Sequence, residues 1–205
     1  MRVSRVTIAP EEDRLNAQIA FAIEIDKLKR IIRRNHLIDG SRRENTAEHS
    51  WYVGTLAMVL GEHAPPGTDL QRVVAMLLVH DLVEIDAGDT FIYDTVAVEA
   101  QAAAERAAAD RIFGLLPGEQ GVWLRELWDE FEARKTPEAR FAKALDRFAP
   151  ILANHHTDGG TWPLFKVKAA QVREKVRIIE EGSPSLGAYA LELVELSVAR
   201  GHLSE

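Results

Sequence analysis

The segment LQRVVAMLLVHDLVEIDAGD, residues 70–89, begins as an apolar helix and turns polar in its second half. Asp69 can cap a helix here and Gly88 can end one, so the sequence predicts a single helix over 70–87. Its apolar residues recur at steps of three and four and share one side, which ought to face the core of a helical bundle. The histidine and acidic residues that continue this side are therefore the first candidates for a functional site.

Helix-forming patterns recur along most of the chain. Asn45 and Glu48 form a capping-box pattern that predicts the start of a helix at residue 46. The expected fold is all-α: one domain over residues 1–205, a bundle of seven or eight helices whose core spans about 17–181, with the C-terminal helix packed on it. The predicted helices cover about 17–34, 46–63, 70–87, 96–115, 119–133, 137–156, 168–181 and 185–200, with 1–16 loosely attached and 35–45 as a turn-rich loop.

The composition favours a cytoplasmic, soluble protein. With 46% hydrophobic residues in 205, the chain can bury a core. Its 25 Lys and Arg against 32 Asp and Glu give a net charge of −7, which argues against nucleic acid as the main partner. There is no cysteine, which excludes disulfides, thiolate metal sites and cysteine nucleophiles. The start resembles no signal peptide, and no apolar stretch approaches the roughly 20 residues that a bilayer requires, so no membrane partner is expected.

Several polar residues fall where a bundle should be apolar. His80, Asp81 and Glu84 continue the apolar side of the 70–87 helix, and a buried carboxylate needs a partner, for which a cation would serve. His49 heads the apolar stripe of the preceding helix, and Asp146 lies at the edge of the core side of helix 137–156. His49, His80, Asp81 and Asp146 together form a nitrogen and oxygen donor set that suits Mn²⁺, Co²⁺, Fe²⁺, Zn²⁺ or Mg²⁺.

Each of these residues also has a structural interpretation. A buried histidine is commonly a hydrogen-bonded core residue. Asp81 could form an ion pair with an arginine such as Arg72, and Asp146 could form one at the surface. Spacing alone leaves the metal site and these structural roles open.

Three strings, RRENTAEHSW (42–51), HDLVEIDAGD (80–89) and ALDRFAP (144–150), resemble the HD-domain superfamily of metal-dependent phosphohydrolases. More narrowly, they resemble its 5′-deoxynucleotidase branch, over about residues 28–153. The resemblance implies an HD-domain helical bundle, a divalent cation, a nucleotide substrate and a homodimer. The ordered set of three strings is specific, whereas a lone His-Asp pair would be weak.

The resemblance also assigns residues by position. It places the catalytic glutamate at Glu84, the substrate-contacting aspartate at Asp89 and the substrate-gripping arginine at Arg34. In the bacterial deoxynucleotidases a tryptophan follows that arginine, whereas Asn35 stands here, which leaves selectivity for deoxyribose open. The implied metal ligands are His49, His80, Asp81 and Asp146.

The chemistry of these residues fits the implied roles. Glu84 lies one helical turn after His80, so it could serve as general acid or base beside a metal-activated water; alternatively it is an exposed charge at a helix end. Asp89 and Thr90 follow the predicted end of the helix and are presented on a loop, as substrate-binding residues often are. For Asp89 the alternative is a turn or cap residue.

Phosphate recognition requires fixed positive charge, which guanidinium groups provide as paired donors. We expect Arg34 to face the substrate. Arg43 could contact the phosphate or instead clamp Glu44 and Glu48, and the sequence leaves both possibilities open.

The sequence therefore predicts a phosphomonoesterase that releases phosphate from nucleoside 5′-monophosphates, deoxyribonucleotides above all, by attack of a metal-activated water. Two alternatives remain. One is a non-catalytic nucleotide-binding or scaffold protein with a structural metal site. The other is an HD phosphodiesterase of another nucleotide, although the GYP signature of cyclic-dinucleotide enzymes is absent.

Overall fold

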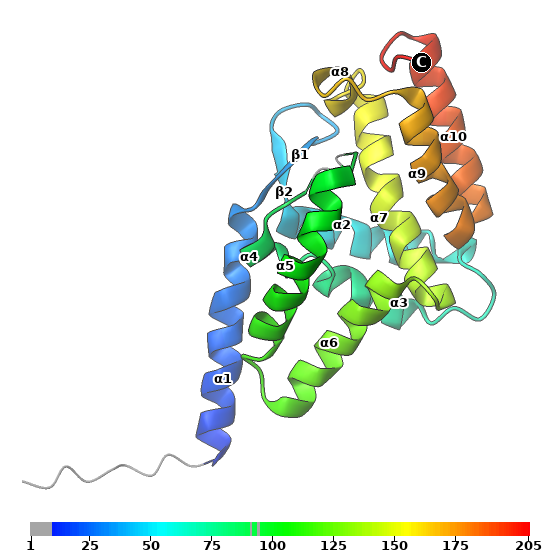
Figure 1. The fold of residues 1–205 in the computed structure, drawn as a ribbon. Coiled ribbons are helices and arrows are strands. Elements are labelled where there is room, and N and C mark those ends of the chain that lie inside the picture. Colours follow the sequence, from blue (N-terminus) through cyan, green and yellow to red (C-terminus); the bar gives the residue numbers. More distant parts are fainter. Residues whose placement is uncertain (1–9, 91, 94) are drawn as a thin grey trace, which may run out of the picture.

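Helices dominate the computed structural model, which describes residues 10–90, 92–93 and 95–205 (Figure 1). Among these residues, eight helices of ten or more residues and two single-turn helices confirm the predicted all-α class. The helices are α1 Pro10–Ile25, α2 Thr46–Val59, α3 Leu70–Val79, α4 Glu84–Ala87, α5 Thr95–Phe113, α6 Gly118–Ala133, α7 Pro137–His156, α8 Thr161–Leu164, α9 Ala169–Gly182 and α10 Pro184–Ala199, with 3₁₀ turns η1 Asp26–Arg30 and η2 Gly61–His63 and strands β1 Ile32–His36 and β2 Arg43–Asn45.

The two predicted N-terminal caps are confirmed. Asn45 accepts a hydrogen bond from the backbone N–H of Glu48 at 3.0 Å, and the Glu48 carboxylate accepts one from the Asn45 N–H at 3.2 Å. The Asp69 carboxylate accepts from the N–H groups of Gln71 and Arg72. These bonds satisfy donors that a helix start leaves free, and they fix where α2 and α3 begin.

The prediction of a helix over 17–34 is wrong at both ends. α1 already begins at Pro10, so residues 10–16 are helical, while residues 1–9 lie outside the described part. After η1 the chain forms β1, which pairs antiparallel with β2 so that Ile32 faces Asn45 and His36 faces Arg43. The pairing of two segments overrides the helical pattern, since β-branched residues such as Ile32 also suit a strand.

The predicted continuous helix over 70–87 is broken at the residues of interest. α3 ends at Val79, a turn covers residues 80–83, and α4 begins at Glu84. Within the turn, backbone hydrogen bonds run from the Leu82 N–H to the Val79 carbonyl and from the Glu84 N–H to the Asp81 carbonyl, three residues back. This tighter winding changes the side on which the polar residues lie relative to a continuous α-helix.

α7 is the central helix of the molecule. It packs against α3 on one side and against α9 and α10 on another, where Figure 1 shows the three helices side by side. Phe141 and Leu145 of α7 are fully buried, as are Val172 and Ile179 of α9. Because α2 and α3 also meet α7, this helix brings distant parts of the sequence to one place.

In the described part of the chain, each helix is too short or too polar to cross a lipid bilayer.

Candidate metal centre and catalytic cavity

Four polar side chains from three segments meet at the middle of α7. His49 comes from α2, His80 and Asp81 from the turn after α3, and Asp146 from α7. His49 is 1% exposed, His80 3% and Asp146 4%. Ligand atoms of His49, His80 and Asp81 lie within 4.8 Å of one another, and His49 Nε2 lies 3.1 Å from Asp146 Oδ1. The structure thus brings together all four residues that the sequence singles out as metal ligands.

The histidine nitrogens are arranged as a cation would require. His80 Nδ1 lies 2.8 Å from the Leu77 carbonyl, so it carries the proton, and Nε2 faces Asp81 Oδ1 at 3.0 Å and Asp146 Oδ1 at 3.8 Å. Among the described residues Nε2 nevertheless has no hydrogen-bond partner, although it is buried. A buried nitrogen left unpaired before two carboxylates fits a divalent cation held by two nitrogen and two oxygen ligands.

The proximity of these side chains also shifts the pKa values of His80 and Asp146. Burial by itself would lower the pKa of His80, but the carboxylates of Asp81 and Asp146 outweigh burial and raise this pKa to about 10. Burial opposes the charge of Asp146, yet the neighbouring Arg147, His49 and His80 hold the pKa of its carboxyl well below the usual value. A cation that binds here replaces the proton of His80, since a ligating imidazole is neutral.

Arg33 is the site residue that sequence reasoning missed. Its side chain is 8% exposed, and its Nη1 lies 3.1 Å from Asp81 Oδ2 and 3.8 Å from Asp89 Oδ1. Burial disfavours its charge, but the carboxylates of Asp81, Glu84 and Asp89 outweigh burial and raise its pKa. Successive side chains of a strand point to opposite sides, which distinguishes Arg33 from Arg34 in β1, whereas the predicted helix over 17–34 does not.

The other two predicted arginines lie differently. The Arg34 guanidinium lies 4.7 Å from the centre of the Phe165 ring, its charge opposes the rise in the pKa of Asp89, and its role toward a substrate stays a prediction. Arg43 does not line the cavity, and among the described residues it forms no ion pair with Glu44 or Glu48: its Nε donates to the Arg33 carbonyl at 2.7 Å, and a role toward phosphate stays a prediction. The expected clamp on Glu48 is made instead by Arg42, through two hydrogen bonds.

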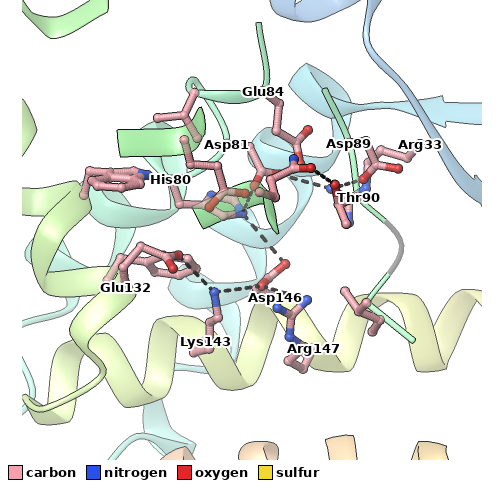
Figure 2. A pocket seen from close by; sticks show the side chains of 16 residues that line it. Arg33, His80, Asp81, Glu84, Asp89, Thr90, Glu132, Lys143, Asp146 and Arg147 are labelled. Carbon is pink, nitrogen blue, oxygen red and sulfur yellow. Dashed lines mark hydrogen bonds and ion pairs between the residues drawn. The ribbon is translucent and has the colours of Figure 1, made fainter. Parts of the chain in front are cut away.

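Glu84, Asp89 and Thr90 border a cavity of about 140 Å³ that the candidate metal ligands His80, Asp81 and Asp146 also line (Figure 2). Glu84 accepts a hydrogen bond from Thr46 Oγ1 at 2.9 Å, and burial together with the charge of Asp81 raises its pKa well above the usual value. Burial also raises the pKa of Asp89, against the opposing charge of Arg33. The Thr90 hydroxyl donates to Gln101.

Two cations of α7 border the same cavity (Figure 2). Lys143 and Arg147 lie one helical turn apart, on either side of Asp146 in the sequence. Asp146 directs Oδ1 to the histidines, while its Oδ2 lies 3.5 Å from Arg147 Nη1 and 4.0 Å from Lys143 Nζ. Lys143 Nζ also lies 3.2 Å from Glu132. The α7 spacing of these residues was visible in the sequence, but it did not decide whether they face the cavity or solvent.

Comparisons with known proteins find similar sequences that are named as 5′-deoxynucleotidases. Human 5′-deoxynucleotidase HDDC2 is 32% identical over 129 residues, which are 62% of this chain and 62% of the human protein. The 5′-deoxynucleotidase hdd1 of Schizosaccharomyces pombe is 29% identical over 132 residues, 62% of this chain and 65% of the yeast protein. The match therefore spans less than two thirds of either relative.

Solved structures show the same fold. A crystal structure from Magnetospirillum magnetotacticum MS-1, described as a predicted metal-dependent phosphohydrolase, is 52% identical with a TM-score of 0.90, over 95% of this chain and 100% of that one. A conserved hypothetical protein from Pyrococcus furiosus has a TM-score of 0.59 at 22% identity, over 88% of this chain and 99% of that one, a likeness of fold alone. The sequence profile of the HD domain matches residues 25–187, which include every candidate ligand and cavity residue described above, and the chain therefore belongs to the HD-domain family.

Proposed function

We propose that this protein is a metal-dependent phosphohydrolase that releases phosphate from nucleoside 5′-monophosphates, deoxyribonucleotides in particular. The observation that carries the proposal is the composition of one cavity. Two histidines and two aspartates, of which all but Asp81 are buried, adjoin an acid with a raised pKa and three cationic side chains that could bind phosphate. The names of the curated relatives support the nucleotide substrate.

The roles follow from the position of each group. His49, His80, Asp81 and Asp146 would hold the divalent cation, whose identity among Mn, Co, Fe, Zn and Mg is open. When bound, such an ion supplies Lewis acidity: it lowers the pKa of water and offsets negative charge on phosphate. Arg33 on one side of the cavity, and Lys143 with Arg147 on the other, would bind the phosphate oxygens and hold the phosphorus in place.

Glu84 would donate the proton that the departing 5′ oxygen requires. In hydrolysis a bond forms between the water oxygen and phosphorus, the bond from phosphorus to the 5′ oxygen breaks, and the departing oxygen needs a proton. Burial raises the pKa of Glu84 and so favours the protonated form of its carboxyl group, which could donate the proton to that oxygen. The hydrogen bond from Thr46 fixes the side chain that makes this transfer.

The test is phosphate release from ribo- and deoxyribonucleoside monophosphates, with Mn²⁺, Co²⁺ or Mg²⁺ added separately to chelator-treated protein. The expected result is release that depends on the added metal. Cation binding without turnover of any substrate would contradict the proposal and favour a non-catalytic nucleotide-binding protein. The same panel, with ribose and deoxyribose compared for each base, tests the selectivity that Asn35 leaves open.

We also propose that two copies associate through the outer face of α2, giving the homodimer that the family resemblance implies. Residues 50–61 carry no charged side chain. Trp51 and Val59 are each 66% exposed, Met58 is 73% exposed, and the neighbouring Leu78 is 49% exposed. A helix that is apolar all round is usually covered on all sides, and an uncharged patch suits a second copy of itself. The cytoplasmic location and the single-domain organisation stay predictions.

A further inference from the structure

We infer that Glu44 is a positioning residue that orients the candidate metal ligand His49 and the cavity arginine Arg33 through one carboxylate. The inference rests on the proposed function, because it concerns how that site is held. Glu44 belongs to the short strand β2, and its side chain is 15% exposed. Its Oε2 lies 3.4 Å from His49 Nδ1 and 3.5 Å from Arg33 Nε.

The contact with His49 selects one ring nitrogen for the cation. His49 Nε2 faces Asp146 Oδ1 at 3.1 Å, on the side of the candidate ligands, whereas Nδ1 faces away from them toward Glu44. A carboxylate next to Nδ1 favours the tautomer with the proton on Nδ1, which leaves the Nε2 lone pair for a metal. It also makes the imidazole a stronger ligand, because it stabilises positive charge on the ring.

The second contact of Glu44 orients the guanidinium of Arg33. Arg33 turns Nη1 toward Asp81 and Asp89, at the wall of the cavity, and Nε toward Glu44. Among the described residues the buried Nε has no hydrogen-bond partner, and Glu44 is the carboxylate next to it. Loss of the Glu44 charge would leave Arg33 Nε without a neighbouring carboxylate. The guanidinium would then be held less rigidly in its orientation toward the cavity.

Glu44 itself does not border the cavity. It lines a separate groove of about 330 Å³ beside Trp51 and Pro150, so it acts through His49 and Arg33 rather than by touching a substrate. One oxygen atom therefore couples a ligand of the metal to a group that binds phosphate. The coupling predicts that changing Glu44 weakens metal binding and substrate binding together.

The experiment compares Glu44→Gln with Glu48→Gln. Glu48 is a carboxylate four residues further on, but it pairs with Arg42 and caps Asn45 instead of contacting the site, so it controls for damage to the start of α2. Each variant is titrated with Mn²⁺ by calorimetry without substrate, and KM and kcat are then measured with the metal saturating. A third variant, Glu44→Asp, keeps the charge on a shorter side chain.

Glu44→Gln should weaken Mn²⁺ binding by about 10- to 100-fold and raise KM more than it lowers kcat. Glu48→Gln should bind Mn²⁺ like the wild type, and Glu44→Asp should recover part of the loss. A folded Glu44→Gln protein with wild-type Mn²⁺ affinity would overturn the inference, as would an equal loss in Glu48→Gln. If the wild type binds Mn²⁺ but hydrolyses nothing, only the proposed function fails, and the metal titrations still decide the role of Glu44.

Discussion

Burial raises the pKa of Glu84, the acid in the cavity, and the variant Glu84→Gln tests its role as a proton donor. The amide keeps the size of the side chain and can still accept the hydrogen bond from Thr46, but it cannot donate a carboxyl proton. We expect kcat to fall by about 10²- to 10⁴-fold, the range for a lost general acid, with the metal content unchanged. Glu48→Gln is the matched control, because Glu48 pairs with Arg42 and does not border the cavity.

Two adjacent arginines compete for the phosphate. The family resemblance favours Arg34, whereas the structure turns Arg33 into the cavity and leaves Arg34 against Phe165. Lysine keeps the charge but loses the paired donors, so we expect Arg33→Lys to raise KM by about 10- to 100-fold and Arg34→Lys to change it less than about threefold. Steady-state kinetics of both variants decide between the residues. A larger rise in KM for Arg34→Lys than for Arg33→Lys would assign phosphate binding to Arg34.

These residues show which parts of a site a single sequence reveals. His80, Asp81 and Asp146 could be found because their polarity conflicts with the apolar side on which they lie. Arg33 could not, because its direction depends on the pairing of β1 with β2, a contact between segments that each look helical or loop-like alone. Nor could the sequence show that Lys143 faces the cavity, since an exposed lysine would have the same spacing.

The packing of α9 on α7 depends on a glycine. A Cβ at Gly182 would lie 2.2 Å from the Arg140 carbonyl oxygen and 2.9 Å from the Ala144 Cβ, so the helices would have to separate. We expect Gly182→Ala to lower the free energy of unfolding by about 1–3 kcal/mol. Gly118→Ala at the start of α6, where a Cβ meets nothing within 4 Å, should be neutral or raise it by up to about 1 kcal/mol. Urea denaturation of both variants measures the difference.

α1 is attached to the rest of the molecule by an ion pair that depends on pH. Glu24 accepts hydrogen bonds from Lys27 and from Arg111 of α5, each at 2.7 Å, and these bonds lower its pKa. A group whose pKa is lowered by folding stabilises the fold above its unfolded value of 4.5, and this contribution is lost as the pH falls through the lower folded value. We therefore expect α1 to lose hydrogen-exchange protection below about pH 4.5.

The control for α1 is Glu24→Gln, because hydrogen bonds also lower the pKa values of Asp26 and Glu119. In this variant the protection of α1 should already be lower at neutral pH and should change less on acidification. An identical acid response in wild type and variant would show that Glu24 is not the attachment. Added salt should weaken the contact in the wild type, since the pair lies near the surface.

Element boundaries were predictable where a local signal fixes them. The caps at Asn45 and Asp69 set the starts of α2 and α3, and Pro137 begins α7 where the sequence predicts it. The break after Val79 was not predictable, because the residues through Ala87 keep helical spacing. The break follows from tertiary contacts of the turn: His80 and Asp81 meet α2, α7 and β1, and no pattern within the segment records these partners.

At the scale of the molecule, the site lies where several segments that are distant in the sequence meet. α2, the turn after α3, and α7 each supply candidate ligands, and β1 adds Arg33 from a further segment. The carboxylates that meet there repel one another unless cations separate them. Arg33, Lys143 and Arg147 supply part of this positive charge, and a divalent ion would supply the rest. This balance explains why a chain with a net charge of −7 can still present a cavity suited to phosphate.

The proposed association of two copies through α2 can be tested by measuring the molecular mass. If the uncharged face of α2 is covered by a second copy, light scattering should give twice the mass of one chain, and Met58→Glu should give the mass of one chain, because two buried carboxylates would face each other. Leu164→Glu is the matched control, since Leu164 is 68% exposed but belongs to α8. A wild-type chain that is monomeric at micromolar concentration contradicts the dimer. A dimer that survives Met58→Glu but not Leu164→Glu would place the contact at α8 instead.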